Sequence, residues 1–98
     1  MHVGPISVPG SHPALAGHFP GNPIVPAALI LNEVIHAAAR WHRITGVAAA
    51  KFIAPVRPDI PFRIELSAAV DGLDFVVTND NETLARGTLL CSRTLEAR

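Results

Sequence analysis

The feature that most limits the fold is one apolar helical pattern that directly follows a stiff loop. Residues 9–26 are rich in proline and glycine, which predicts an irregular but rigid loop. Pro26 suits the first turn of a helix, and the pattern predicts a helix from Ala27 to about Arg43, with Gly46 as its stop. Most of this helix is apolar, so other parts of the protein must cover it. Its polar side chains gather on one face and are Asn32, Glu33, His36 and Arg40.

The rest of the chain supplies strands that can cover the helix. Segments rich in Val, Ile, Leu, Phe and Thr predict the strands Val47–Pro55, Phe62–Val70, Leu73–Thr78 and Thr83–Arg93. Residues 1–8 predict a further short strand, interrupted by Pro5. Asp71-Gly72 and the run Asn79–Asn81 predict hairpin turns, which would make the sheet antiparallel. We therefore expect an α+β fold over residues 1–98 as a single domain, with one long helix wrapped by a curved antiparallel sheet.

Composition narrows the partners and the compartment. The chain has 98 residues, of which 49% are hydrophobic and 16% charged, so a single small subunit would leave apolar surface exposed. A homodimer is the expected solution. A formal net charge of zero argues against nucleic-acid binding, and no apolar run is long enough to span a membrane. The N-terminus does not resemble a signal peptide, and the single Cys91 excludes an internal disulfide and a cysteine-based zinc site. A cytoplasmic protein is the simplest expectation.

The chemistry suggested by the residues themselves starts at His18. This histidine lies in the proline-rich loop, which can hold an imidazole in one orientation as a general base requires. The helix predicted to begin at Ala27 has first N–H groups without intrahelical partners, and these favour negative charge in front of it. Such a pair suits proton abstraction next to a thioester or ketone carbonyl. A loop-stabilising hydrogen bond from His18 to the backbone explains the local pattern equally well.

Other reactive or charged side chains have simpler interpretations. His36 lies one helical turn beyond Asn32, where it can serve as a second polar group in the same cavity or as a structural hydrogen-bonding residue. Cys91 is predicted to be a core residue and Trp41 to pack in the core or in a dimer interface. No convincing metal-ligand set is found. A set of basic side chains can form either a rim for an acidic carrier or ordinary surface charge: Arg40, Arg43, Lys51, Arg57 and Arg63.

Two sequence blocks resemble a known family. HFPGNPIVPAALIL, from His18, resembles the His-Phe-Pro-Gly-x-Pro-x-x-Pro-Gly signature of the 3-hydroxyacyl-acyl-carrier-protein dehydratases. KFIAPVRPDIPFRIEL, Lys51 to Leu66, is similar to the family segment Lys-Phe-x-x-Pro-Val-x-Pro-Gly-Asp-x-Leu. With the lead-in HPALAGHFPG, these blocks cover about half of the chain in the family's order. The resemblance implies a hotdog fold and a dimer whose two sheets join, with active sites at the interface and with trimers of dimers among the larger assemblies.

The resemblance also implies roles for particular residues. His18 would remove the C2 proton of a 3-hydroxyacyl thioester, and the Ala27 N–H would bind the thioester oxygen. The family's catalytic carboxylate, supplied by the partner subunit, falls at Asn32, which has no proton to transfer at neutral pH. Glu33 is adjacent, but the helix turns it about 100° away. The remaining residues that would line the substrate site are Phe19, Gly21, Pro26 and His36.

The function implied is dehydration of a 3-hydroxyacyl thioester to the trans-2-enoyl thioester in fatty-acid or related acyl-chain biosynthesis. The substrate would be carried on the phosphopantetheine of acyl carrier protein or CoA, with no other cofactor and no metal. The first alternative is a weakly active or inactive hotdog subunit that binds acyl carrier protein or pairs with a catalytic paralogue. A hotdog thioesterase is a third interpretation, which the HFPG loop disfavours.

Overall fold

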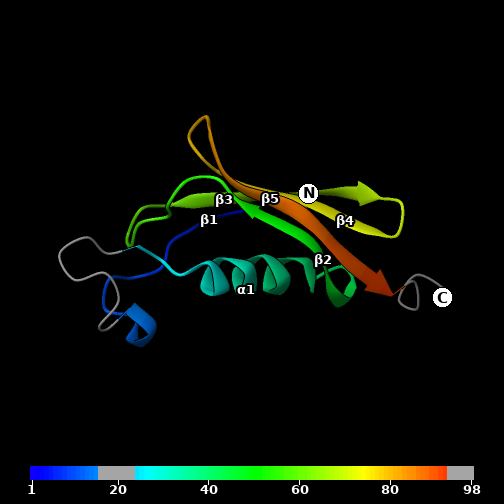
Figure 1. Ribbon diagram of the computed structural model, residues 1–98, viewed down its shortest axis with the longest axis horizontal. Helices are drawn as coiled ribbons and strands as arrows, with labels where there is room; N and C mark the ends of the chain where they lie inside the picture. The colour runs from blue at the N-terminus through cyan, green and yellow to red at the C-terminus, as the bar shows by residue number, and fades with distance from the viewer. Residues whose placement is uncertain (16–23, 93–98) are drawn as a thin grey trace.

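The computed structural model describes residues 1–15 and 24–92. In these residues one α-helix lies across one face of an antiparallel sheet (Figure 1). The spatial order of the strands is β1-β3-β4-β5-β2, and every neighbouring pair is antiparallel. This is the α+β arrangement that the sequence predicted. The elements are β1 His2–Ile6, the short 3-10 helix η1 Pro13–Leu15, α1 Ala27–Ala38, β2 Arg43–Phe52, β3 Phe62–Ala69, β4 Gly72–Asn79 and β5 Glu82–Ser92.

The core lies between α1 and the sheet. One side of α1 is buried, and it consists of Ile30, Val34, Ala37 and Ala38. Alternate side chains of β3 and β4 face it because successive residues of a strand point to opposite sides. The buried residues of these two strands are Phe62, Ile64, Leu66, Leu73, Phe75 and Val77. Cys91, predicted as a core residue, is half-buried and packs against this core.

The helix is shorter than the sequence predicted. It ends at Ala38, and Trp41 and His42 donate backbone hydrogen bonds back to the Ala38 carbonyl at 3.0 and 3.1 Å. The chain then enters β2 at Arg43, so Gly46 lies inside a strand and does not stop the helix. The β-branched side chains at the start of β2 favour pairing with β5 over a further helical turn. Trp41 is 43% exposed, so of its two predicted places the core is wrong, and packing in a dimer interface stays a prediction.

Two glycines allow β5 to approach its neighbours closely. The predicted hairpin turns are present, shifted so that Val70-Asp71 and Asp80-Asn81 form the turns and Gly72 opens β4. A Cβ on Gly72 would overlap the Leu89 backbone. A Cβ on Gly87 would overlap the Ala49 carbonyl and lie 2.7 Å from the ring of buried Phe75.

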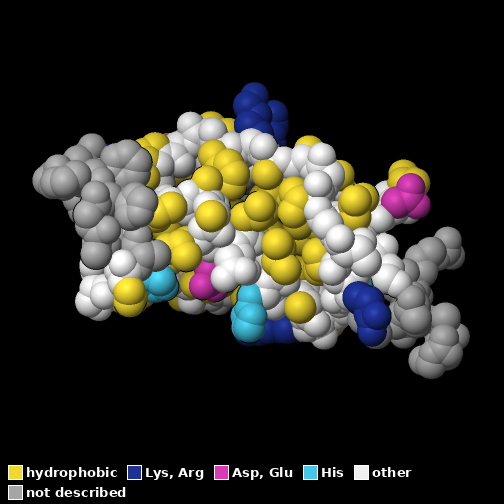
Figure 2. Space-filling view, turned by 60° about the horizontal axis from the view of Figure 1, so that its bottom comes forward, with side chains coloured by type: hydrophobic (Ala, Val, Ile, Leu, Met, Phe, Trp, Pro, Cys, Tyr) yellow, Lys and Arg dark blue, Asp and Glu magenta, His cyan; other side chains and the backbone are white. Residues whose placement is uncertain are grey.

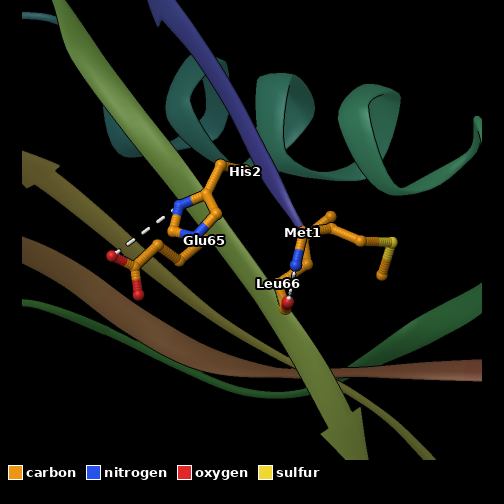
Figure 3. A network of polar contacts seen from close by, with 4 residues as sticks. All are labelled: Met1, His2, Glu65 and Leu66. Carbon is orange, nitrogen blue, oxygen red and sulfur yellow. Dashed lines mark hydrogen bonds and ion pairs between the residues drawn. The ribbon is translucent and has the colours of Figure 1, made fainter.

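β1 completes the sheet next to β3. Its pairing register shifts between Val3 and Ile6, where the sequence predicted an interruption at Pro5, and the Gly4–Pro5 peptide bond is cis. The amino group of Met1 donates to the Leu66 carbonyl at 2.8 Å, and His2 Nδ1 lies 3.9 Å from Glu65 Oε2 (Figure 3). His2 and Glu65 are both largely exposed, so this ion pair stabilises the sheet weakly.

β2 is an open edge of the sheet. It pairs with β5 on one side, and its residues 47–52 are all exposed. Val47, Phe52 and the following Ile53 are 36%, 41% and 49% exposed, so several large apolar side chains are exposed along this one edge. On the helix side of the molecule, hydrophobic side chains cover much of the middle of the surface (Figure 2). A strand edge with small and apolar side chains is a surface to which another strand can be added.

Candidate active site

The start of α1 carries free backbone donors. Pro26 is the residue that precedes the helix, with an extended backbone at φ −58° and ψ 144°, and no side chain caps the helix. The Pro26 carbonyl accepts hydrogen bonds from the Leu29 and Ile30 N–H groups at 3.0 and 3.4 Å. The N–H groups of Ala27 and Ala28 precede these and have no intrahelical acceptor by geometry. The helix start predicted at Ala27 is confirmed, and its exposed amides favour negative charge in front of them.

An apolar pocket of about 260 Å³ opens beside this helix start. Ala27 and Ile30 form its helix wall, and the opposite wall comes from the end of β2 and the residues after it. The full lining is Ile24, Val25, Ala27, Ile30, Phe52, Ile53, Ala54, Pro55 and Val56. A pocket of this composition beside backbone N–H donors can hold an acyl chain while the donors meet a carbonyl oxygen.

Asn32 and Glu33 point to different surroundings. Asn32 is exposed, whereas Glu33 is half-buried. Glu33 lines a groove of about 340 Å³ between α1 and β1, together with His36 and Arg40. Asn32 is not part of that groove, so the predicted polar face divides into Asn32 and a group of three that faces β1. Glu33 is therefore turned away from Asn32, as the helical angle predicted, and His36 shares a cavity with Glu33.

His18, Phe19 and Gly21 lie outside the described residues, so their predicted roles stay predictions. The structure does describe the chain on both sides of them. Leu15 is 8% exposed and Val25 is 3% exposed. The Val25 N–H donates to the Val56 carbonyl at 2.7 Å. The described residues on either side, Leu15 and Val25, are therefore both part of the core.

Two of the basic residues that the sequence singled out lie far apart. Arg43 and Lys51 stand at opposite ends of β2, about 26 Å apart at 3.3 Å per residue. Lys51 instead pairs across the strands with Arg86 of β5, which the sequence reasoning missed. The sequence reasoning also did not predict that Phe52 and Ile53 line the apolar pocket. The similarity of the Lys51–Leu66 block to the family could have indicated that these residues belong to the site. It did not indicate that the block packs against α1.

Residues 1–15 and 24–92 contain neither a clustered metal-ligand set nor a membrane-spanning helix. No group of three or more His, Cys, Asp or Glu side chains there is arranged to hold a metal ion. No helix in that part of the chain combines the length and apolar character needed to cross a membrane.

Comparisons with known proteins agree with this architecture. The FabZ 3-hydroxyacyl-(acyl-carrier-protein) dehydratase of Thermomicrobium roseum is 31% identical over 75 residues, covering 65% of this chain and 50% of that protein. The chain thus spans about half the length of this relative. FabZ of Erwinia tasmaniensis is 27% identical over an alignment 105 positions long, which covers 89% of this chain and 70% of that protein.

A solved structure shows the same fold. The dehydratase heterocomplex ApeI:P from Xenorhabdus doucetiae includes a chain that superposes with a TM-score of 0.69 at 20% identity, covering 95% of each chain. This match confirms the hotdog fold that the sequence motifs predicted. The model of the ApeI-like family, described as ApeI dehydratase, matches residues 2–88. The protein therefore belongs to the ApeI-like dehydratase family, a hotdog family related to acyl-chain biosynthesis.

Proposed function

We propose that this protein dehydrates a 3-hydroxyacyl thioester, carried on acyl carrier protein or CoA, to the trans-2-enoyl thioester. The observation that carries the proposal is the apolar pocket beside the uncapped start of α1. An acyl chain in this pocket would place its thioester carbonyl near the Ala27 N–H. Membership of a dehydratase family supports the reaction type.

The proposed reaction assigns one task to each residue. His18 takes the C2 proton, and the electron pair left at C2 moves toward the carbonyl carbon. Negative charge grows on the thioester oxygen, where the Ala27 N–H donates a hydrogen bond to it. The C2–C3 double bond then forms as the C3 hydroxyl leaves as water with a proton taken from solvent, and the protonated His18 returns the C2 proton to solvent.

The weak point of this site is the proton for the leaving hydroxyl. Asn32 can donate a hydrogen bond from its amide but cannot transfer a proton. Loss of a general acid typically lowers a rate by about 100- to 10,000-fold. Glu33 faces the groove beside β1 and is an unsuitable replacement. Asn32 is exposed in the single chain, so in an assembly it can lie against a second subunit.

The second subunit is proposed to join along β2. In the stretch from Val47 to Ala50 the side chains are small or β-branched, and all are exposed at the sheet edge. A second copy that pairs its own β2 here would extend the sheet and cover the exposed Phe52 and Ile53. The resulting assembly is a homodimer, which can associate further into a trimer of dimers.

One alternative has a specific observation in its favour. A weakly active or inactive subunit that pairs with a catalytic paralogue accounts for Asn32 directly, because the partner would supply the missing acid. The structural relative ApeI:P is itself a heterocomplex. Under this alternative β2 pairs with the paralogue. A thioesterase remains a third candidate and would release free thiol from an acyl-CoA without forming an enoyl product.

Hydration of crotonyl-CoA, the reverse reaction, tests the proposal through loss of the enoyl-thioester absorbance. We expect measurable hydration by the wild type, none by His18→Ala, and a rate about 100- to 10,000-fold higher for Asn32→Glu, the range of a general acid. Asn81→Glu adds the same charge in the exposed β4–β5 turn and serves as the control. A wild-type rate equal to that of His18→Ala, not raised by Asn32→Glu, would reject the dehydratase proposal and favour the heteromeric subunit.

A further inference from the structure

The loop between β2 and β3 touches the chain on both sides of the segment that carries His18. On the entry side, the Asp59 N–H donates to the Val8 carbonyl at 2.8 Å. The Gly10 N–H donates to the Asp59 carboxylate Oδ1 at 3.1 Å. On the exit side, the Val25 N–H donates to the Val56 carbonyl at 2.7 Å. One loop thus holds both flanks of residues 11–24.

This loop is itself fixed to the sheet. The N–H groups of Ile53 and Ala54 both donate to the Leu84 carbonyl, at 2.8 and 3.1 Å. At the other end of the loop, Asn79 Nδ2 donates to the Pro61 carbonyl at 2.5 Å. Buried valines lie where the loop meets the two flanks, namely Val8, Val25 and Val56. The sheet therefore serves as a fixed support for both flanks.

Asp59, in the loop between β2 and β3, has a backbone conformation that residues other than glycine rarely adopt. Its φ is +66°, in the left-handed region, and it follows Pro58 in a turn that closes weakly from the Ile60 N–H to the Arg57 carbonyl at 3.4 Å. A proline followed by a positive φ is the pattern of a type II turn, which favours glycine at the second of these positions. The dehydratase segment that this block resembles has glycine at the position of Asp59. Aspartate tolerates this conformation and adds a carboxylate that glycine lacks.

We propose that Asp59 is a positioning residue, which holds the entry flank of the His18 segment on the β2–β3 loop. The effect on catalysis rests on the proposed dehydratase function, since it requires His18 to act as the base. The carboxylate acts through the Gly10 N–H and does not touch the substrate pocket. Asp59 and Gly10 are both exposed, so their hydrogen bond adds little to global stability. Its role is to fix where the segment leaves the core.

The chain provides matched variants for the test. Asp59→Gly keeps the turn and removes the carboxylate, whereas Asp59→Asn keeps both the turn and an acceptor oxygen. Gly10→Pro removes the N–H that donates to Asp59. Gly10 is the second residue of a turn in which the His12 N–H donates to the Pro9 carbonyl at 2.9 Å, and this position of a turn accepts proline. Asp80→Gly is the control, because Asp80 is also an exposed aspartate with positive φ, in the β4–β5 turn.

The primary measurement is amide hydrogen exchange by NMR at Leu15 on the entry flank and at Val25 on the exit flank, neither of which has a hydrogen bond to Asp59. For Asp59→Gly we expect roughly 3- to 10-fold faster exchange at Leu15, from local opening of the entry flank. Exchange at Val25 should be unchanged, because its N–H donates to the Val56 carbonyl. The crotonyl-CoA hydration kcat should fall by roughly 3- to 10-fold with KM unchanged, because small displacements of a catalytic group slow the chemical step. Gly10→Pro should act in the same direction, and the double variant should be no worse than Asp59→Gly alone. Asp59→Asn and Asp80→Gly should match the wild type.

Two results would overturn the proposal. One is exchange at Leu15 that is the same in Asp59→Gly as in Asp80→Gly. The other is faster exchange with an unchanged kcat in a protein that hydrates crotonyl-CoA. If neither the wild type nor Asn32→Glu has activity, the proposed function fails on its own, and the exchange measurement still decides whether Asp59 holds the entry flank.

Discussion

Replacing Ile30 and Ile53 by alanine separates the stability of the helix–sheet core from the shape of the acyl pocket. Both isoleucines line the pocket at the start of α1, but Ile30 is 1% exposed and Ile53 is 49% exposed. The same chemical change is therefore made twice in one pocket, once in the core and once at the surface. Both variants should alter acyl-chain binding, whereas one alone should strongly destabilise the fold.

The expected magnitudes follow from burial. Ile30→Ala removes a fully buried side chain and leaves a cavity under α1, which typically costs about 2–5 kcal/mol. Full burial of an isoleucine contributes about 1.5–3 kcal/mol, and about half of the Ile53 side chain is already in water, so Ile53→Ala should cost about 1 kcal/mol. Domains of this size are stable by only about 5–15 kcal/mol, so Ile30→Ala would remove a large share.

Equilibrium urea unfolding, followed by circular dichroism, measures both free energies. The transition midpoint should fall far more for Ile30→Ala, with similar m values for the two variants. The comparison should be repeated at several protein concentrations, since an interface that covers Ile53 would add a cost that depends on concentration. If the two substitutions cost the same to within about 0.5 kcal/mol at low concentration, the placement of Ile30 in the core is refuted.

Two further substitutions, each with a matched control, probe the sheet. Gly87→Ala should destabilise the fold by more than about 3 kcal/mol and lower the thermal midpoint, because its Cβ overlaps backbone and the Phe75 ring. Gly46→Ala is the control: its Cβ would lie 3.6 Å from a Leu90 methyl, so the thermal midpoint should change little. Ala49→Asp on the β2 edge should convert the proposed dimer to a monomer, as measured by analytical ultracentrifugation. Ala68→Asp, on the interior strand β3, is the control and should leave the dimer intact. Equal effects of the two substitutions would argue against pairing along β2.

Local sequence signals predicted the starts of elements better than their ends. Pro26 marked the start of α1 because its missing N–H and restricted φ suit a helix start and exclude a helix interior. The end of α1 was predicted too late because the apolar pattern continues past Ala38, while the chain turns to pair β2 with β5. That pairing joins segments far apart in the sequence, and no local signal reports it.

The candidate site shows the same division. The helical angle between Asn32 and Glu33 was readable from the sequence, since it depends on helix geometry alone, and the structure places the two side chains in different surroundings. The groove that Glu33 shares with β1 and the pocket wall from Phe52 and Ile53 depend on how distant segments pack. The cross-strand neighbours Lys51 and Arg86 were missed for the same reason.

The strand order has a consequence for how the chain folds during synthesis. β2 is made before β3 and β4, yet its partner within the chain is β5, whose last residue is Ser92. The β3–β4 hairpin can form as soon as it leaves the ribosome, while β2 waits with its apolar edge unpaired until β5 arrives. Closing such distant pairings is slow, and an unpaired edge invites association with other chains. We therefore expect nascent chains that end at Asn79 to bind general chaperones more than full-length chains do, a difference that ribosome-bound chains of defined length would reveal.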